Sequence, residues 1–202
     1  MKSLYLMRHG ETLFNAQHKV QGWCDSPLTE TGKEQALAAR KYFQQNEIHF
    51  DHCYASTQER ACDTLELVID SQKYSRRKNL KEMHFGQFEG ASTYLQPKGP
   101  ESYESFYVAF GGESGEEVRQ RMMAELTDIM ANEVEDSALV VSHNGAIFYF
   151  LQQVLPEESE LPLHLANGGF LKFSFEQGKF TYLETVNPTE EMAQHDHSLD
   201  NK

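Results

Sequence analysis

An apolar run near the start of the chain ends abruptly in charged and small residues, and this stretch most constrains how the chain can fold. Residues 4–7 read Leu-Tyr-Leu-Met and predict a buried strand. Arg8 keeps its proton at any ordinary pH and His9 follows it directly, so the end of the strand attracts an anion. Gly10 allows a sharp turn where a side chain would obstruct a ligand. The stretch therefore predicts a strand whose carboxyl end opens into an oxyanion pocket, as in open α/β sheets.

A second histidine stands at the end of a second apolar run, far down the chain. Residues 138–141 read Ala-Leu-Val-Val and predict another buried strand, which leads through Ser142 to His143 and then into a helix. Because the carboxyl ends of parallel strands meet at one edge of a sheet, we expect His9 and His143 on the same rim. This rim is a candidate anion site.

The tripeptide Arg8-His9-Gly10 after the first strand and His143 much later resemble the histidine phosphatase superfamily, the phosphoglycerate-mutase-like group. The resemblance covers nearly all of residues 3–186. It implies an α/β fold, a three-layer α/β/α sandwich with a mainly parallel central sheet.

The length and composition suit a single unit. With 202 residues, 39% of them apolar, the chain is long enough for one good core and short for two domains. We expect one domain over residues 1–187, in which residues 169–176 and 179–186 form a β-hairpin. A lid-like insertion is expected at about 91–112, and an acidic, flexible tail at 188–202.

The insertion at 91–112 is irregular and rich in aromatic residues. Its rings admit two interpretations, a cover over the core or the wall of a pocket for an apolar or ring-bearing leaving group. The sequence leaves both open. The capping-box spacing of Ser114 and Glu117 predicts that a helix follows directly.

An arginine lies at the predicted start of another helix. Ser56 and Glu59 have the spacing of a capping box, with Ser56 as the cap, so Arg60 falls in the first turn, where free backbone amides favour an anion. Residues 55–64 are similar to the second arginine segment of the family, and this implies that Arg60 binds the phosphoryl group. A surface arginine paired with Glu59 or Asp63 is the alternative that the residues alone leave open.

Residues 80–90 resemble the segment in which phosphatases of this superfamily carry their acid. Glu82 matches the catalytic position, and Glu89 matches a second glutamate that is usually structural. Taken alone, either glutamate is a solvated surface charge. The mutases that the chain resembles are longer and carry a different run after the glutamate, so the resemblance favours a phosphatase.

Four more residues are expected to contact the phosphoryl group or the rest of the substrate. Asn15 follows the first strand closely enough to add an amide donor. The resemblance adds Gln21 and Gly22 from the next loop. Asn144 begins the helix after the second histidine, where the family usually has glycine, so its side chain is expected to narrow the pocket.

The residues and the resemblance together predict a metal-independent phosphomonoester hydrolase that acts on a small phosphorylated metabolite through a phosphohistidine. His9 is the expected nucleophile, and His143 is expected to stabilise the transferring phosphoryl group. Glu82 is expected to protonate the leaving oxygen and then to activate water. Arg8 and Arg60 are expected to grip the phosphoryl oxygens.

Other classes of function are less consistent with these residues. We expect no metal and no cofactor, because two arginines beside the histidines would repel a metal ion. Phosphoglycerate mutase-type phosphoryl transfer is the main alternative, and a non-catalytic phosphate-binding module is a further one. A module of that kind would have lost the nucleophile or the acid.

The net charge and the cysteine content limit which partners and which compartment are expected. The 18 Lys and Arg against 31 Asp and Glu give a formal net charge of −13, which opposes binding to nucleic acid or to an anionic membrane surface. Three cysteines without a Cys-x-x-Cys pair suggest neither disulfides nor zinc, and no apolar run has the length of a signal peptide or a membrane span. We therefore expect a cytoplasmic protein. The oligomeric state is left open, with a homodimer as one alternative.

Overall fold

The computed structural model describes residues 1–99, 103–155 and 164–191. Within these residues, six strands form one sheet: β1 Lys2–Arg8, β2 His52–Ser56, β3 Ser75–Arg77, β4 Ser137–Ser142, β5 Phe170–Glu176 and β6 Lys179–Val186. The strand order is β3-β2-β4-β1-β5-β6. The first four strands in this order run parallel, whereas β5 is antiparallel to both β1 and β6. The mainly parallel sheet and the terminal hairpin predicted from the sequence are confirmed.

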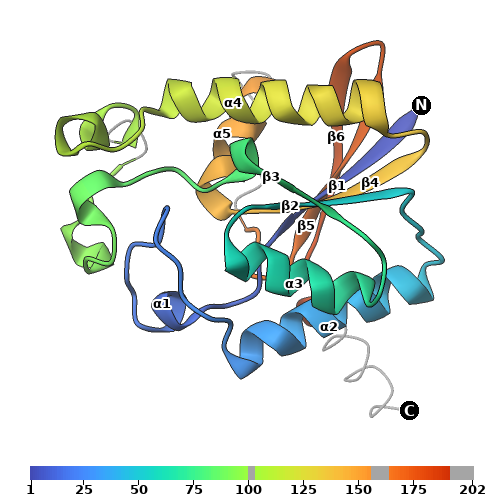
Figure 1. Cartoon of the computed structure of the whole chain (residues 1–202), viewed down its shortest axis with the longest axis horizontal. Helices are drawn as coiled ribbons and strands as arrows, with labels where there is room; N and C mark the ends of the chain where they lie inside the picture. The colour runs from blue at the N-terminus through green and yellow to red at the C-terminus, as the bar shows by residue number, and fades with distance from the viewer. Residues whose placement is uncertain (100–102, 156–163, 192–202) are drawn as a thin grey trace.

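Helices cover both faces of the sheet. The described α-helices are α1 Leu13–Ala16, α2 Glu30–Gln45, α3 Glu59–Ile69, α4 Gly115–Asp128 and α5 Asn144–Val154. Figure 1 shows α4 and α5 above the sheet and α2 and α3 below it. This arrangement confirms the three-layer α/β/α sandwich. In the described part of the chain, no helix is long and apolar enough to cross a membrane.

The apolar strands are continuous because both of their faces are covered. In β1, Leu4 and Leu6 pack in the cluster formed with α4 and α5, while Tyr5 and Met7 pack in the cluster formed with α2 and α3. All four side chains are buried. Alternate residues of a strand point to opposite faces, so a central strand between two helical layers needs apolar residues at every position.

Of the two capping boxes predicted from the sequence, one is confirmed and one is not. Thr29 caps α2, and Ser114 and Glu117 form the predicted capping box of α4. The capping box predicted at Ser56 is wrong. Ser56 is still the last residue of β2, α3 begins at Glu59 after Gln58, and its cap has no side-chain hydrogen bond.

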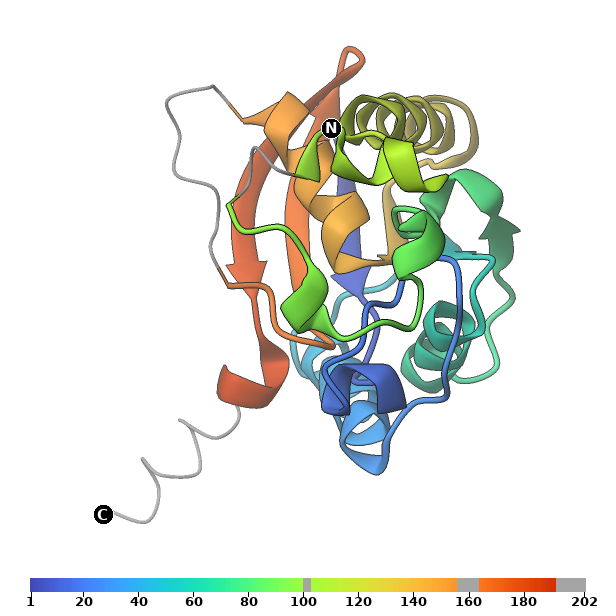
Figure 2. The same cartoon turned by 90° about the vertical axis from the view of Figure 1, so that its left-hand side faces the viewer.

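Short helices surround the edge of the sheet at which β1 and β4 end. They are the 3₁₀ helices η1 Lys78–Leu80, η2 Gly86–Phe88, η3 Thr93–Leu95 and η5 Phe106–Phe110; a π-helix, η6 Ile129–Glu133, continues α4 at its far end. Figure 2 turns this edge toward the viewer, with α1, η3 and η5 in front of the sheet.

Aromatic rings of the insertion at 91–112 lie both on the core and at a cavity. Tyr107 is fully buried and packs edge-on against Phe88, so part of the segment covers the core. Tyr103 instead lines a cavity. In the predicted tail, residues 188–191 form a helical turn, and residues 192–202 lie outside the described residues.

Candidate active site

The two histidines lie on one edge of the sheet, as expected, because β1 and β4 pair in parallel with Arg8 opposite Ser142. His9 and His143 are the next residues along each strand, and their ring centroids are 5.2 Å apart. Both side chains are buried. Two distant parts of the sequence therefore meet in one shielded place.

A hydrogen bond fixes which ring nitrogen of His9 carries the proton. Nδ1 lies 2.7 Å from the carbonyl oxygen of Gly10. Because a carbonyl oxygen can only accept, Nδ1 is the donor and Nε2 keeps its lone pair. Burial lowers the pKa of His9 well below its ordinary value, and the charges of Arg60 and Arg8 lower this pKa further. His9 is thus a neutral imidazole with an unprotonated Nε2.

Gly10 holds this turn by close packing. A Cβ atom at Gly10 would lie 2.3 Å from the carbonyl oxygen of Gly32 in the first turn of α2, so no side chain fits. The backbone N–H of Gly10 donates to the hydroxyl of Thr64 on α3 at 3.0 Å. The loop that carries His9 is therefore fixed against both helices of one layer.

Arg60, the second residue of α3, is buried beside His9. Its Nε donates to Nε2 of His9 at 3.3 Å. Its two terminal nitrogens donate to three oxygens of one loop, namely Gly22 O at 2.8 Å, Cys24 O at 3.0 Å and Asp25 Oδ1 at 2.9 Å. The ion pair of Arg60 is with this loop, and not with Glu59 or Asp63.

Arg8 adds a second guanidinium at the end of β1. Its Nη1 donates to the carbonyl oxygen of Leu165 at 2.9 Å. Its Nε is buried and has no hydrogen-bond partner among the described residues. Burial lowers the pKa of Arg8, although the charge of Glu82 acts in the opposite sense. A buried N–H without an acceptor costs about 1–3 kcal/mol, which an anion in the cavity would recover.

His143 is held by a residue for which the sequence predicted another role. Nε2 of His143 lies 2.6 Å from Oγ of Ser56, and both side chains are fully buried. Ser56 Oγ also accepts from the backbone N–H of Gln58 at 3.3 Å. We assign the hydroxyl as the donor to Nε2, since it has no other acceptor among the described residues, and this places the ring proton of neutral His143 on Nδ1.

Glu82 lies against the start of α5. Its carboxylate accepts from the backbone N–H groups of Met83 at 2.8 Å, Gly145 at 2.9 Å and Ala146 at 2.8 Å. The Glu82 side chain is buried. The carboxylate is therefore fixed in position by three donors.

Glu89 has the structural role that the resemblance implied. Its carboxylate accepts from the backbone N–H groups of Gly22, Trp23, Cys24 and Phe85. Although burial raises the pKa of Glu89, these hydrogen bonds and one from the Cys24 side chain produce a net lowering. Glu89 thus holds the loop that in turn binds Arg60.

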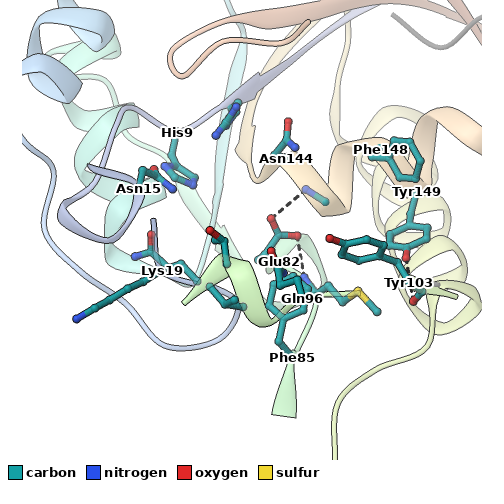
Figure 3. Close-up of a pocket in the computed structure, with 16 residues that line it drawn as sticks. His9, Asn15, Lys19, Glu82, Phe85, Gln96, Tyr103, Asn144, Phe148 and Tyr149 are labelled. Carbon is teal, nitrogen blue, oxygen red and sulfur yellow. Dashed lines mark hydrogen bonds between the residues drawn. The ribbon is translucent and has the colours of Figure 1, made fainter. Parts of the chain in front are cut away.

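A cavity of about 460 Å³ joins several of these groups (Figure 3). Six of the predicted site residues line it: Arg8, His9, Asn15, Gln21, Glu82 and Asn144. Arg60 and His143 lie behind this surface. Gly22 does not line the cavity; its N–H donates to Glu89 and its carbonyl oxygen accepts from Arg60.

The side-chain amides at the cavity differ in which of their hydrogen-bonding groups remain available to a ligand. Asn15 accepts at Oδ1 from the backbone N–H of Thr12 at 3.1 Å, which leaves its NH₂ group as a donor. Gln21 is bound at both ends, since its Oε1 accepts from the Thr12 hydroxyl and its Nε2 donates to Ser26. Asn144 is exposed at the cavity.

Several lining residues were missing from the sequence prediction. Among them are Lys19, Phe85, Phe148 and Tyr149, together with Tyr103, which the sequence placed only in an aromatic insertion. In the sequence, Phe148 and Tyr149 are part of an apolar helix, and nothing there separates a pocket wall from a core face.

Within the described residues, no group of three or more His, Cys, Asp or Glu side chains is arranged to hold a metal ion.

Known proteins resemble this chain over most of its length. The sequence profile of the histidine phosphatase superfamily (branch 1) matches residues 4–188. A broad-specificity phosphatase of Saccharomyces cerevisiae is 31% identical over 165 positions, covering 74% of this chain and 68% of that protein. A metal-independent phosphoserine phosphatase of Arabidopsis thaliana is 31% identical over 157 positions, covering 71% of this chain and 65% of that protein.

A solved structure shares the fold as well. The crystal structure of a phosphoglycerate mutase from Bacillus anthracis superimposes with a TM-score of 0.81, at 28% identity, and the match covers 95% of each chain.

Proposed function

The chain belongs to the histidine phosphatase superfamily, and on this premise we propose that it is a metal-independent phosphomonoester hydrolase that acts through a phosphohistidine on His9. One observation carries the proposal. The hydrogen bond from Nδ1 of His9 to Gly10 leaves Nε2 unprotonated, beside Arg60 and in the same cavity as Glu82. This combination supplies a nucleophile, a positive charge and an acid.

In the first step, Nε2 of His9 attacks the phosphorus of the ester, a P–N bond forms and the P–O bond to the alcohol breaks. Glu82 gives a proton to the leaving oxygen as the P–O bond breaks. The guanidinium groups of Arg8 and Arg60 and the Nδ1–H of His143 stabilise the charge on the phosphoryl oxygens.

In the second step, water attacks the phosphorus and the P–N bond breaks. Glu82, now a carboxylate, accepts a proton from this water, inorganic phosphate is released and His9 returns to its neutral form. The same residue serves as the acid and then as the base, so the cycle closes without a metal or a cofactor.

The remaining predicted residues receive different roles. We assign Asn15, through its free NH₂ group, and Asn144, exposed at the cavity, as donors to the substrate. The side chain of Gln21 is hydrogen-bonded to Thr12 and Ser26, and the backbone of Gly22 is hydrogen-bonded to Glu89 and Arg60, so we assign both residues to holding the loop that binds Arg60.

The proposals for the substrate, the partners and the compartment rest on features of the sequence. We propose a small phosphorylated metabolite as substrate and no nucleic acid or membrane partner, in keeping with the net charge of −13. We also propose the cytoplasm as the compartment, in keeping with the free thiols of Cys24, Cys53 and Cys62.

Mutase activity is the second candidate, and the similarity to the Bacillus anthracis phosphoglycerate mutase favours it. The two activities share the first step and differ in what accepts the phosphoryl group from His9. A mutase assay with bisphosphoglycerate as primer separates them, because a hydrolase releases phosphate whereas a mutase transfers the phosphoryl group to the sugar acid.

The direct test is capture of the intermediate. The enzyme is mixed briefly with p-nitrophenyl phosphate and quenched in alkali, in which phosphohistidine is stable. We expect one phosphate on the peptide that contains His9, none in His9→Ala, and an unchanged result in His49→Ala, which alters an exposed histidine. Chelator should not change the rate. Comparable turnover by His9→Ala, or loss of activity in chelator with recovery on adding a divalent ion, would contradict the proposal.

A further inference from the structure

The cavity has two ends of different chemistry, and the mechanism above uses one of them. The reacting end carries Arg8, His9 and Asn15. In Figure 3, Glu82 lies between this end and a wall to its right and below. This distal wall consists of four aromatic residues from three parts of the chain: Phe85, Tyr103, and the adjacent Phe148 and Tyr149. Since Glu82 is the proposed donor to the leaving oxygen, the alcohol of the ester extends toward these rings.

The distal wall is anchored on the core. The hydroxyl of Tyr149 donates to the backbone oxygen of Tyr103 at 3.3 Å, and Tyr149 is buried. The ring centroids of Tyr103 and Phe85 lie 5.8 Å and 4.8 Å from that of Tyr107, which is fully buried. Rings that are already fixed lose little conformational freedom when a ligand binds.

The distal wall lacks positive charge. Of the described residues that line the cavity, the basic ones are Arg8, His9 and Lys19. Figure 3 shows Lys19 extending away from Glu82 and from the rings, and its Nζ lies 5.1 Å from the ring of Phe14. An anionic group at the rings would lose its hydration without gaining an ion pair from the described residues that line the cavity.

Neighbouring charges do not change this conclusion. Arg119 lies 5.5 Å from the ring centroid of Tyr149 but does not line the cavity, and its charge is paired with Glu104 and Glu116. Burial raises the pKa of Tyr103, and burial together with Glu104 raises that of Tyr149, so both phenols stay uncharged at neutral pH.

We propose that the distal wall binds the leaving alcohol and selects phosphomonoesters whose alcohol is an uncharged, ring-bearing group over those that carry a carboxylate or a second phosphate. This inference rests on the proposed function and specifies its substrate class. The cavity volume of about 460 Å³ is in the range of small-molecule sites and accommodates a phosphoryl group with one ring system. Ring-to-ring contact contributes roughly a tenfold preference.

The test compares phenethyl phosphate, ethyl phosphate and phosphoglycerate by kcat/KM. Phenethyl and ethyl phosphate leave as alcohols of similar basicity, so the contribution of Glu82 cancels and their ratio reports the ring. We expect phenethyl phosphate to exceed each of the others by about tenfold or more.

Variants assign the preference to the distal wall. Tyr103→Leu and Phe148→Leu remove a ring and keep apolar volume, and each should move the ratio of phenethyl to ethyl phosphate toward one. Tyr94→Leu is the matched control, because Tyr94 belongs to the same insertion, is 91% exposed and does not line the cavity. Its ratio should equal that of the wild type. Phe148→Lys should raise the relative rate on phosphoglycerate.

The outcomes separate this inference from the proposed function. Hydrolysis of all three esters by the wild type without a preference for the ring, or with a preference for phosphoglycerate, would overturn the inference alone, even if a variant failed to fold. Failure to hydrolyse any ester, p-nitrophenyl phosphate included, would overturn the proposed function and the inference with it.

Discussion

Glu82 and Gly145 are joined by a hydrogen bond in which the backbone N–H of Gly145 donates to Oε2 of Glu82 at 2.9 Å. Gly145 lies in the first turn of α5, the helix that directly follows His143. The free amides of a helix start favour a negative group, so this helix both follows the second histidine and holds the proposed acid. The position of Glu82 therefore depends on a residue far from it in sequence.

We expect Gly145→Ala to displace Glu82. A Cβ atom at Gly145 would lie 2.7 Å from Oε1 of Glu82, which is too close for contact. The variant should lose about tenfold to hundredfold in the rate of phosphoryl transfer from ethyl phosphate, which is part of the usual contribution of a general acid. As a control, Gly145→Ala is added to Glu82→Gln. If Gly145→Ala lowers the rate by displacing Glu82, it should lower the rate of the Glu82→Gln variant little further. Additive losses would contradict this explanation.

Ser56 is expected to set the tautomer of His143. Ser56→Ala leaves Nε2 of His143 without its partner at 2.6 Å, so the proton is no longer fixed on Nδ1. The rate of His9 phosphorylation should fall by about tenfold or more, and Ser56→Thr, which keeps the hydroxyl, should restore part of it. The nitrogen-15 NMR shifts of the His143 ring give a readout that a purely structural role would not change. If those shifts report the same tautomer in Ser56→Ala, the assignment is wrong.

Stability should fall as the pH drops below about 7. Burial lowers the pKa values of His9 and His143 well below that of an ordinary histidine, near 6.5. At pH values between the folded-state pKa and the unfolded-state pKa of a histidine, the unfolded chain binds more protons than the folded one. Each histidine therefore lowers the free energy of unfolding by up to about 1.4 kcal/mol for each unit by which the pH falls. Above about pH 7.5 this contribution is constant. Urea unfolding at a series of pH values measures the slope of the free energy of unfolding against pH. His9→Ala should reduce this slope by the amount that corresponds to about one proton.

Much of the fold is predictable because its signals are local. The burial of both faces of β1 follows from a continuous apolar run, and the spacing of Ser114 and Glu117 alone predicts the start of α4. Ser56 has the same spacing to Glu59, yet it ends a strand and its hydroxyl turns to His143. The sequence pattern was the same, and the contact that decided between the two roles came from a distant strand.

The parts that were missed depend on pairing and packing between distant segments. β3 was not predicted, because Ser75–Arg77 has two exposed residues and no apolar pattern, and its pairing with β2 defines it. The distal wall was missed in part for a related reason. Phe148 is one of several apolar residues in α5, and it lines the cavity together with Tyr103, which comes from a distant part of the sequence.

Leaving-group dependence should show whether Glu82 is the acid. Proton donation matters most when the departing oxygen is strongly basic, as in ethyl phosphate, and least for p-nitrophenyl phosphate, which leaves as a stabilised phenolate. Glu82→Gln keeps the shape but cannot transfer a proton, so it should slow phosphoryl transfer from ethyl phosphate by about 10²–10⁴ and from p-nitrophenyl phosphate far less.

The comparison belongs in the burst phase, because Glu82 is also the proposed base for hydrolysis of the phosphohistidine and steady-state turnover can be slow with both esters. Glu89→Gln is the matched control: this glutamate binds the backbone of the loop at Gly22 and does not line the cavity, so any loss should be equal for the two esters. Equal losses for Glu82→Gln as well would show that Glu82 orders the site and does not act as its acid.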